Sequence, residues 1–121
     1  MSDAPLSRLL TVCATCLALA SACASPSPSQ RQFESLRRMG EKALLEGRPL
    51  HAREPLRRAV ALVQVVGADD LEEVDLLRRL SMACRQLGAL GEARARLTRA
   101  ARLLSRERLR ADRAGRSFRQ V

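Results

Sequence analysis

The sequence predicts an all-α protein made of two antiparallel helix–turn–helix units, followed by a C-terminal helical extension or cap. Three observations predict this class. Apolar residues from Phe33 onward recur every three or four positions, the spacing that lines one face of an α-helix. Gly and Pro interrupt this pattern where turns are expected. The pattern also repeats at a fixed offset, from Leu36 to Leu77, and such self-similarity is typical of stacked helical units.

The repeated positions carry small or apolar residues in both units. The first set is Leu36, Met39, Gly40, Ala43, Gly47, Ala52, Leu56 and Ala59, and the second is Leu77, Leu80, Ser81, Cys84, Gly88, Ala93, Leu97 and Ala100. Small residues let two helices approach closely, and the larger apolar residues fill the space between them. We therefore expect Cys84 to lie in the core.

We expect six segments along the chain. These are a signal peptide over 1–22, a lipid-anchored Ser/Pro linker over 23–32, repeat 1 over 33–66, an acidic loop over 67–73, repeat 2 over 74–107, and a basic helical extension with a frayed tail over 108–121. The alternating Ser and Pro of 25–30 predict an extended linker, because Pro lacks an N–H and fixes its φ angle. Pro55 leaves the start of the second helix open, since Pro fits best in a first helical turn. Gly115 is expected to end the last helix.

The N-terminal segment has the pattern of a targeting signal. Residues 9–22 carry no charge, but the run is shorter than the roughly 20 residues that span a bilayer. It fits the apolar core of a secretory signal peptide. Leu19-Ala20-Ser21-Ala22-Cys23 resembles the lipobox of bacterial lipoproteins, which implies that Cys23 becomes the lipid-modified first residue. Cleavage after Ala24, or a retained cytoplasmic N-terminus, is the alternative.

The two units resemble tetratricopeptide repeats. The first gives Leu36-x2-Met39-Gly40-x2-Ala43 and Ala52-x3-Leu56, and the second gives Leu77-x2-Leu80-Ser81-x2-Cys84 and Ala93-x3-Leu97. The 41-residue offset is similar to the longer repeats of kinesin light chains and their bacterial relatives. Gly67-Ala68-Asp69 matches the G-x-D loop of those repeats, and Arg57-Arg58-Ala59-Val60 matches their R-R-A-L. The resemblance implies a stack of helices that binds other proteins.

The resemblance also implies where a ligand would lie. In this family the binding groove follows the first helix of each unit, which here presents Arg37, Glu41, Leu44, Arg78, Met82 and Arg85. Some members hold a partner's C-terminal carboxylate with Lys and Asn on this face. Glu41 and Met82 stand where Asn is needed, so that specificity is not expected here.

The charge of the chain suggests a second binding surface. The net charge is +9, and Lys42 is the only lysine. An Arg stripe on one face of the last helix, at steps of 3 or 4, comprises Arg99, Arg102, Arg106, Arg110 and Arg113. Such a stripe suits anionic lipid, phosphate or an acidic protein. The chain has no Trp or Tyr to stack on bases, which disfavours nucleic acid. An Arg-rich genome, which uses Arg for ordinary surface charge, also accounts for the excess.

No combination of residues predicts catalysis, a metal site or a cofactor. His51 is the single histidine and has no Cys or carboxylate at ligand spacing. Cys13 and Cys16 lie in the apolar N-terminal run without polar ligands nearby. We therefore expect a non-enzymatic adaptor, lipid-anchored in the bacterial cell envelope, whose partner is another envelope protein. Self-association stays open. The alternative is a secreted or cytoplasmic basic helical protein that binds polyanions through the Arg stripe.

Overall fold

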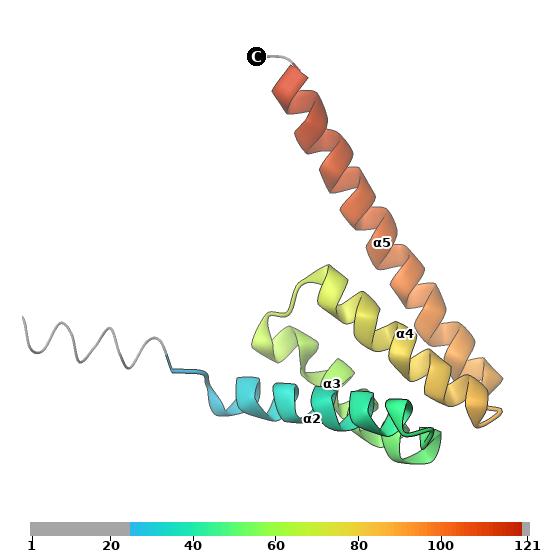
Figure 1. Cartoon of the computed structure of the whole chain (residues 1–121). Helices are drawn as coiled ribbons and strands as arrows, with labels where there is room; N and C mark the ends of the chain where they lie inside the picture. The colour runs from blue at the N-terminus through green and yellow to red at the C-terminus, as the bar shows by residue number, and fades with distance from the viewer. Residues whose placement is uncertain (1–24, 120–121) are drawn as a thin grey trace, which may run out of the picture.

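The computed structural model describes residues 25–119, and this part of the chain is helical without strands. Its helices are α2 (Pro28–Leu45), α3 (Pro49–Val66), α4 (Asp70–Gln86) and α5 (Leu90–Arg119). The all-α class is therefore confirmed. Each helix packs against the next one, and α2 also touches α4. The C-terminal half of α5 projects away from the other helices (Figure 1).

α2 begins earlier than the sequence predicts. The expected linker extends to residue 32, but the helix starts at Pro28. Ser27 is the N-cap, and its hydroxyl accepts a hydrogen bond from the amide of Gln30 at 3.1 Å. Pro at the first helical position needs no amide hydrogen, so the Ser-Pro pair starts the helix instead of preventing it.

α3 contains Pro55 in its interior rather than beginning near it. The helix starts at Pro49, which also occupies a first-turn position. Pro55 has no amide hydrogen to donate to the carbonyl of His51, so one hydrogen bond of the helix is missing there. His51 is exposed at this point of the surface. Burial of the apolar face of α3 on both sides of Pro55 keeps the helix continuous.

The loop between α3 and α4 is shorter than the acidic loop expected over 67–73. Gly67 ends α3 with a φ of 66°, in the left-handed region that favours glycine. Asp69 then caps α4: its side chain accepts from the amide of Glu72 at 2.8 Å, and the Glu72 side chain accepts from the amide of Asp69. Residues 70–73 are therefore the first turn of α4, where carboxylates are favoured by the helix dipole.

The core lies between α2, α3 and α4, with one residue from the start of α5. It contains Phe33, Leu36, Ala43, Ala52, Leu56, Ala59, Val63, Leu76, Leu80, Ala83, Cys84 and Ala93. A smaller cluster of Val74, Leu77, Ala100 and Leu103 joins α4 to α5. Cys84 is fully buried, as expected. Most of these residues are small or aliphatic, so the stability of the stack depends on close approach of the helices.

α5 is longer than expected. It continues through Gly115 to Arg119. The prediction that Gly115 ends the helix is therefore wrong. The prediction that the chain is frayed from Ser117 onward is also wrong for residues 117–119. An interior Gly costs a helix only about 1 kcal/mol relative to Ala, and no Pro follows to stop it. Residues 108–119 extend α5 in a straight line and do not fold back as a cap over its apolar side (Figure 1).

The expected signal peptide over 1–22 and the lipidation site Cys23 lie outside the described residues. Within 25–119, no helix combines the length and hydrophobicity needed to cross a bilayer.

Gly40→Ala tests the close approach of α2 and α3. A Cβ at position 40 would lie 2.5 Å from the Cγ of Leu56, so either the Leu56 side chain or one of the helices must move. We expect the free energy of unfolding to fall by about 1–3 kcal/mol in urea denaturation followed by circular dichroism. Gly91→Ala is the control, because a Cβ there meets no atom within 4 Å. Equal stability of the two variants would contradict the close packing of the two helices.

Candidate functional site

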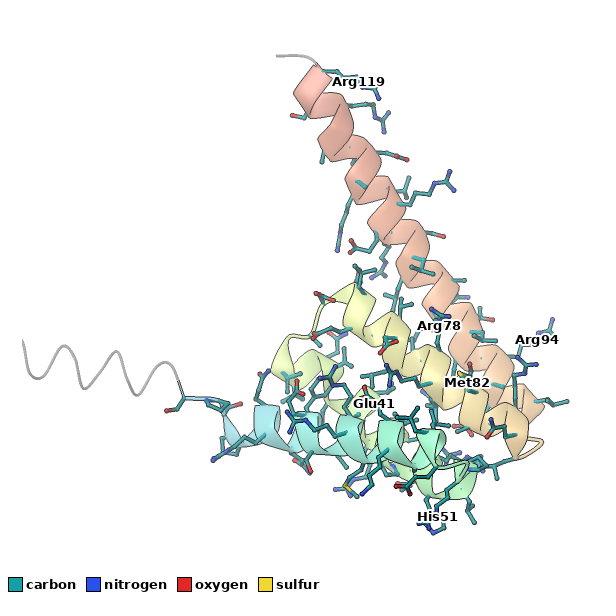
Figure 2. The ribbon with its side chains drawn as sticks, in the orientation of Figure 1. Glu41, His51, Arg78, Met82, Arg94 and Arg119 are labelled. Atoms are coloured by element: carbon teal, nitrogen blue, oxygen red, sulfur yellow. The ribbon has the colours of Figure 1, made fainter. Side chains whose placement is uncertain are left out.

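The predicted groove residues on α2 are held by internal contacts. Arg37 donates to the carboxylate of Glu34 at 2.8 Å. Glu41 forms an ion pair with Arg79 of α4 at 3.0 Å, so it points toward α4 and links the two helices (Figure 2). Leu44 is half-buried against the main core. These three side chains therefore contribute first to the packing of α2.

The predicted groove residues on α4 are exposed. Arg78, Met82 and Arg85 all face solvent, and Met82 is 51% exposed. The α2 residues of the predicted groove are thus engaged in contacts within the protein, whereas its α4 residues are exposed. Arg79 was missed by sequence reasoning, although it joins α2 and α4 by contacting both Glu41 and Asp75. Its position one turn after Asp75 was the available signal.

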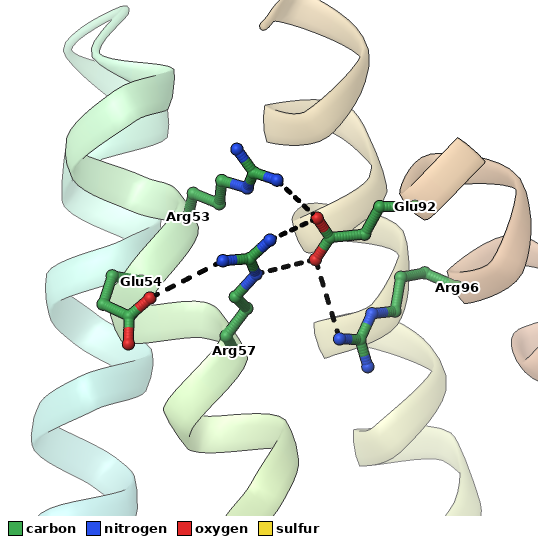
Figure 3. Close-up of polar contacts among 5 residues, drawn as sticks. All are labelled: Arg53, Glu54, Arg57, Glu92 and Arg96. Carbon is green, nitrogen blue, oxygen red and sulfur yellow. Dashed lines mark hydrogen bonds and ion pairs between the residues drawn. The ribbon is translucent and has the colours of Figure 1, made fainter. Parts of the chain in front are cut away.

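A cluster around Glu92 connects the two helix pairs (Figure 3). The Glu92 carboxylate accepts from Nη2 of Arg53 at 2.7 Å and from Nε and Nη2 of Arg57, with the Nε distance at 2.7 Å. Arg96 lies 3.6 Å away, and Glu54 contacts Arg57 from the outer side at 3.8 Å. Because Arg53 and Arg57 are on α3 and Glu92 is on α5, the cluster fixes the second pair against the first.

The Glu92 cluster shifts the pKa of Glu92 itself and of the neighbouring Cys84 thiol. Hydrogen bonds from Arg57 and then Arg53 hold the pKa of the Glu92 carboxyl well below its usual range, against the opposing effect of partial burial. Burial, together with the negative charge of Glu92, raises the pKa of the Cys84 thiol. A buried thiol with a raised pKa is a poor nucleophile, and Cys84 packs in the core.

The predicted Arg stripe on α5 is only partly free. Arg99 donates to Glu73, a buried carboxylate on α4. Arg110 contacts Asp70 at 3.3 Å and Glu107 at 2.6 Å. The other members, Arg102, Arg106 and Arg113, are exposed and form no ion pair with the described residues. The stripe therefore combines contacts that hold α4 to α5 with three free guanidinium groups.

An apolar surface next to the end of α4 was not predicted as a site. Leu90, Leu97 and Leu104 recur at every seventh position on one side of α5, and all are exposed. A shallow groove there is lined by Arg85, Leu90, Ala93, Arg94, Leu97, Thr98 and Ala101. We call Arg85, Leu90, Arg94, Leu97, Ala101 and Leu104 the open face. The repeat offset was the signal that could have identified it, since it aligns Leu97 and Leu104 with the buried Leu56 and Val63.

The described part of the chain includes no candidate metal site. His51 lies exposed at the edge of the molecule (Figure 2). No three His, Cys, Asp or Glu side chains within 25–119 are grouped so that they could hold a metal ion.

No protein-family model, curated protein or solved structure matches this chain.

Glu92→Gln tests the stabilising role of the cluster. A carboxyl with a depressed pKa in the folded state stabilises the fold above its unfolded pKa of about 4.3, and this stabilisation is lost as the pH falls below that value. At pH 7 we expect the variant to be less stable by about 1–3 kcal/mol, because the Arg partners lose a charged acceptor. The difference from the wild type should narrow as the pH falls from 5 toward about 3.

The control for this measurement is Asp112→Asn, which changes an exposed carboxylate of α5 that has no ion pair in the described part of the chain. Its stability should follow the wild type over the same pH range. A constant difference between Glu92→Gln and the wild type at every pH would contradict the role assigned to the charge of Glu92.

Proposed function

We propose that this chain is a non-enzymatic protein-interaction module of tetratricopeptide type, anchored through a lipid on Cys23 in the bacterial cell envelope. Its partner would be another envelope protein. The observation that carries the binding function is the apolar surface of Leu90, Leu97 and Leu104, which the described residues leave uncovered.

Equivalent residues of the two sequence units support the repeat interpretation. Gly40 and Ser81, which are 41 positions apart, are both buried on the first helix of a pair. Ala52 and Ala93 are both buried near the start of the second helix. Small residues at matching positions permit matching close approaches, as a repeated helix–turn–helix unit requires.

The ends of the stack are unequal, and this supports a binding role for one of them. Leu56 and Val63 are 0% and 1% exposed because they lie in the core that α3 shares with α2 and α4. Their counterparts one repeat later, Leu97 and Leu104, are 41% and 47% exposed because the described residues place no helix over them. A repeat stack normally covers its terminal faces with polar residues. An apolar terminal face instead favours contact with another protein.

A lipid on Cys23 would place this stack near a membrane. Only Ala24, Ser25, Pro26 and Ser27 separate Cys23 from the first residue of α2. Four residues span at most about 13–14 Å, so the helices would lie close to the headgroups. Such a tether concentrates a small binding module at one surface and favours partners that are also in the envelope.

A second candidate function is polyanion binding through the free part of the Arg stripe. Arg102, Arg106 and Arg113 are exposed on α5 and lack acidic partners in the described residues. They could bind lipid phosphates with roughly 1 kcal/mol from each Arg. Binding of this kind weakens steeply with salt.

The anchor is tested by mass spectrometry and membrane fractionation of the wild type beside Cys23→Ser. We expect a mature product that begins at a lipid-modified Cys23, and we expect this modification to be lost in the variant. Cys16→Ser is the matched control and should leave the mature product unchanged. A soluble wild-type chain that begins at Met1 would contradict the anchor and move attention to the Arg stripe.

The binding role is tested by a photo-crosslinking amino acid at position 97 of the full chain in living bacterial cells. We expect a discrete product that contains a second protein, because Leu97 lies on the uncovered apolar surface. The control position is 45, which is also exposed but lies at the C-terminal end of α2. Crosslinked products that form equally at positions 97 and 45, or at neither position, would contradict a specific protein contact at the open face.

A further inference from the structure

The open face of α5 has an equivalent on α3, where the matching residues are buried in the interior of the molecule. On α3, Leu56 and Val63 occupy the places in the repeat that Leu97 and Leu104 occupy on α5. These two residues share the main core with Leu76, Leu80 and Ala83, which are spaced by 3 and 4 along α4. One amphipathic helix, α4, therefore supplies the apolar stripe by which the second unit joins the core that buries the leucine and valine of α3. A helix with the same spacing fits the open face.

A carboxylate accompanies the packing of the second helix pair on α3. Arg53, the counterpart of Arg94 in the first unit, donates to the carboxylate of Glu92 at 2.7 Å. Glu92 follows α4 directly after a turn, so the covering segment supplies the acid. Arg94 is exposed and has no ion pair among the described residues. The equivalent contact at the open face needs a carboxylate from the occupant.

The open face itself selects for acidic partners. Its groove contains Arg85 and Arg94, and none of the residues that line it carries a negative charge. Arg85 is exposed and without an ion pair in the part of the chain that is described. An apolar strip bordered by cations is complementary to a helix that is apolar on one side and acidic on the flanks.

A second copy of the chain does not offer this complement. If its α2 covered α5 as α4 covers α3, Ser35, Met39 and Lys42 would take the places of Leu76, Leu80 and Ala83. His51 would take the place of Glu92. The outer face of α2 would therefore meet the leucines with two polar side chains and only one apolar one, Met39, and it would meet Arg94 without a carboxylate.

We infer that the open face of α4 and α5 binds an acidic amphipathic helix of a partner protein. The inference rests on the proposed protein-binding function and names the chemistry of its ligand. The leucines and Ala101 supply the apolar contact, while Arg85 and Arg94 pair with carboxylates on the flanks of the bound helix.

The test uses the full chain and a fluorescent amphipathic peptide of about 20 residues, with Leu and Ala on one face and Glu and Gln on the other. Its matched control carries Lys in place of every Glu. We expect fluorescence anisotropy to show saturable binding of the Glu peptide and at least about tenfold weaker binding of the Lys peptide, since like charges at an interface are strongly unfavourable.

Variants of the chain locate the binding. Leu97→Gln combined with Leu104→Gln should weaken the Glu peptide by about tenfold or more, because both side chains lose apolar contact. Arg94→Glu should weaken binding of the Glu peptide and strengthen binding of the Lys peptide. The control is Leu45→Gln combined with Leu50→Gln, which changes two exposed leucines away from the open face and should leave binding unchanged. All these side chains are at least partly exposed, so the fold should persist, as circular dichroism would show.

Other outcomes would overturn the inference in distinguishable ways. Equal binding of both peptides, lost in the Leu97/Leu104 variant, would remove the acidic specificity and leave the protein-binding function standing. A dimer in sedimentation equilibrium that this variant dissociates would make a second copy the occupant. Peptide binding only after removal of residues 1–24 would make the chain's own N-terminal segment the occupant. No peptide binding, with only salt-sensitive binding to anionic vesicles, would overturn both this inference and the proposed function.

Discussion

The packing of Leu56 against Gly40 is the contact on which the helical stack depends. Leu56 is completely buried, and it lies in the one cluster of the described residues that draws on α2, α3 and α4 together. The absence of a side chain on Gly40 lets α3 approach α2 closely enough for Leu56 to fill the space between them. A core that contains Phe33 and otherwise mostly small and aliphatic residues has little other volume with which to hold three helices together.

Ion pairs complete the assembly in a way that follows from the Arg-rich composition. Glu41, Glu73 and Glu92 each bind an Arg from a different helix. These carboxylates are partly or fully buried, so their contacts are less screened than pairs on the open surface. Glu92 is the α5 member of this set, and Glu107 and Asp112 are the other acidic residues of α5, so this helix has a large excess of Arg. The sequence sets this excess, and the contacts between helices decide which of the charges are paired.

Much of the fold could be predicted because its signals are local. The helical spacing from Phe33, the Gly67 turn and the acidic start of α4 all correspond to observed helix boundaries within a few positions. The errors have local causes too. Ser27 and Pro28 start a helix that composition suggested was linker, and Gly115 is too weak a signal to end a helix of Arg and Ala. The candidate site was predicted less well, because Glu41 and Arg99 were assigned to ligands but bind side chains of neighbouring helices.

The sequence by itself determined the helical class, the offset between the two similar units and the basic charge of the last helix, because periodicity and composition are properties of the chain. Only the tertiary structure decided which of two equivalent residues is buried. Leu56 and Leu97 have matching places in the two similar sequence units, yet Leu56 is buried in the core between α2, α3 and α4, and the described residues leave Leu97 partly exposed. The tertiary structure also decided that Glu92 joins Arg53 and Arg57, which are distant from it along the chain. Burial and ion pairing depend on which helices meet, and no local pattern specifies the end of a stack.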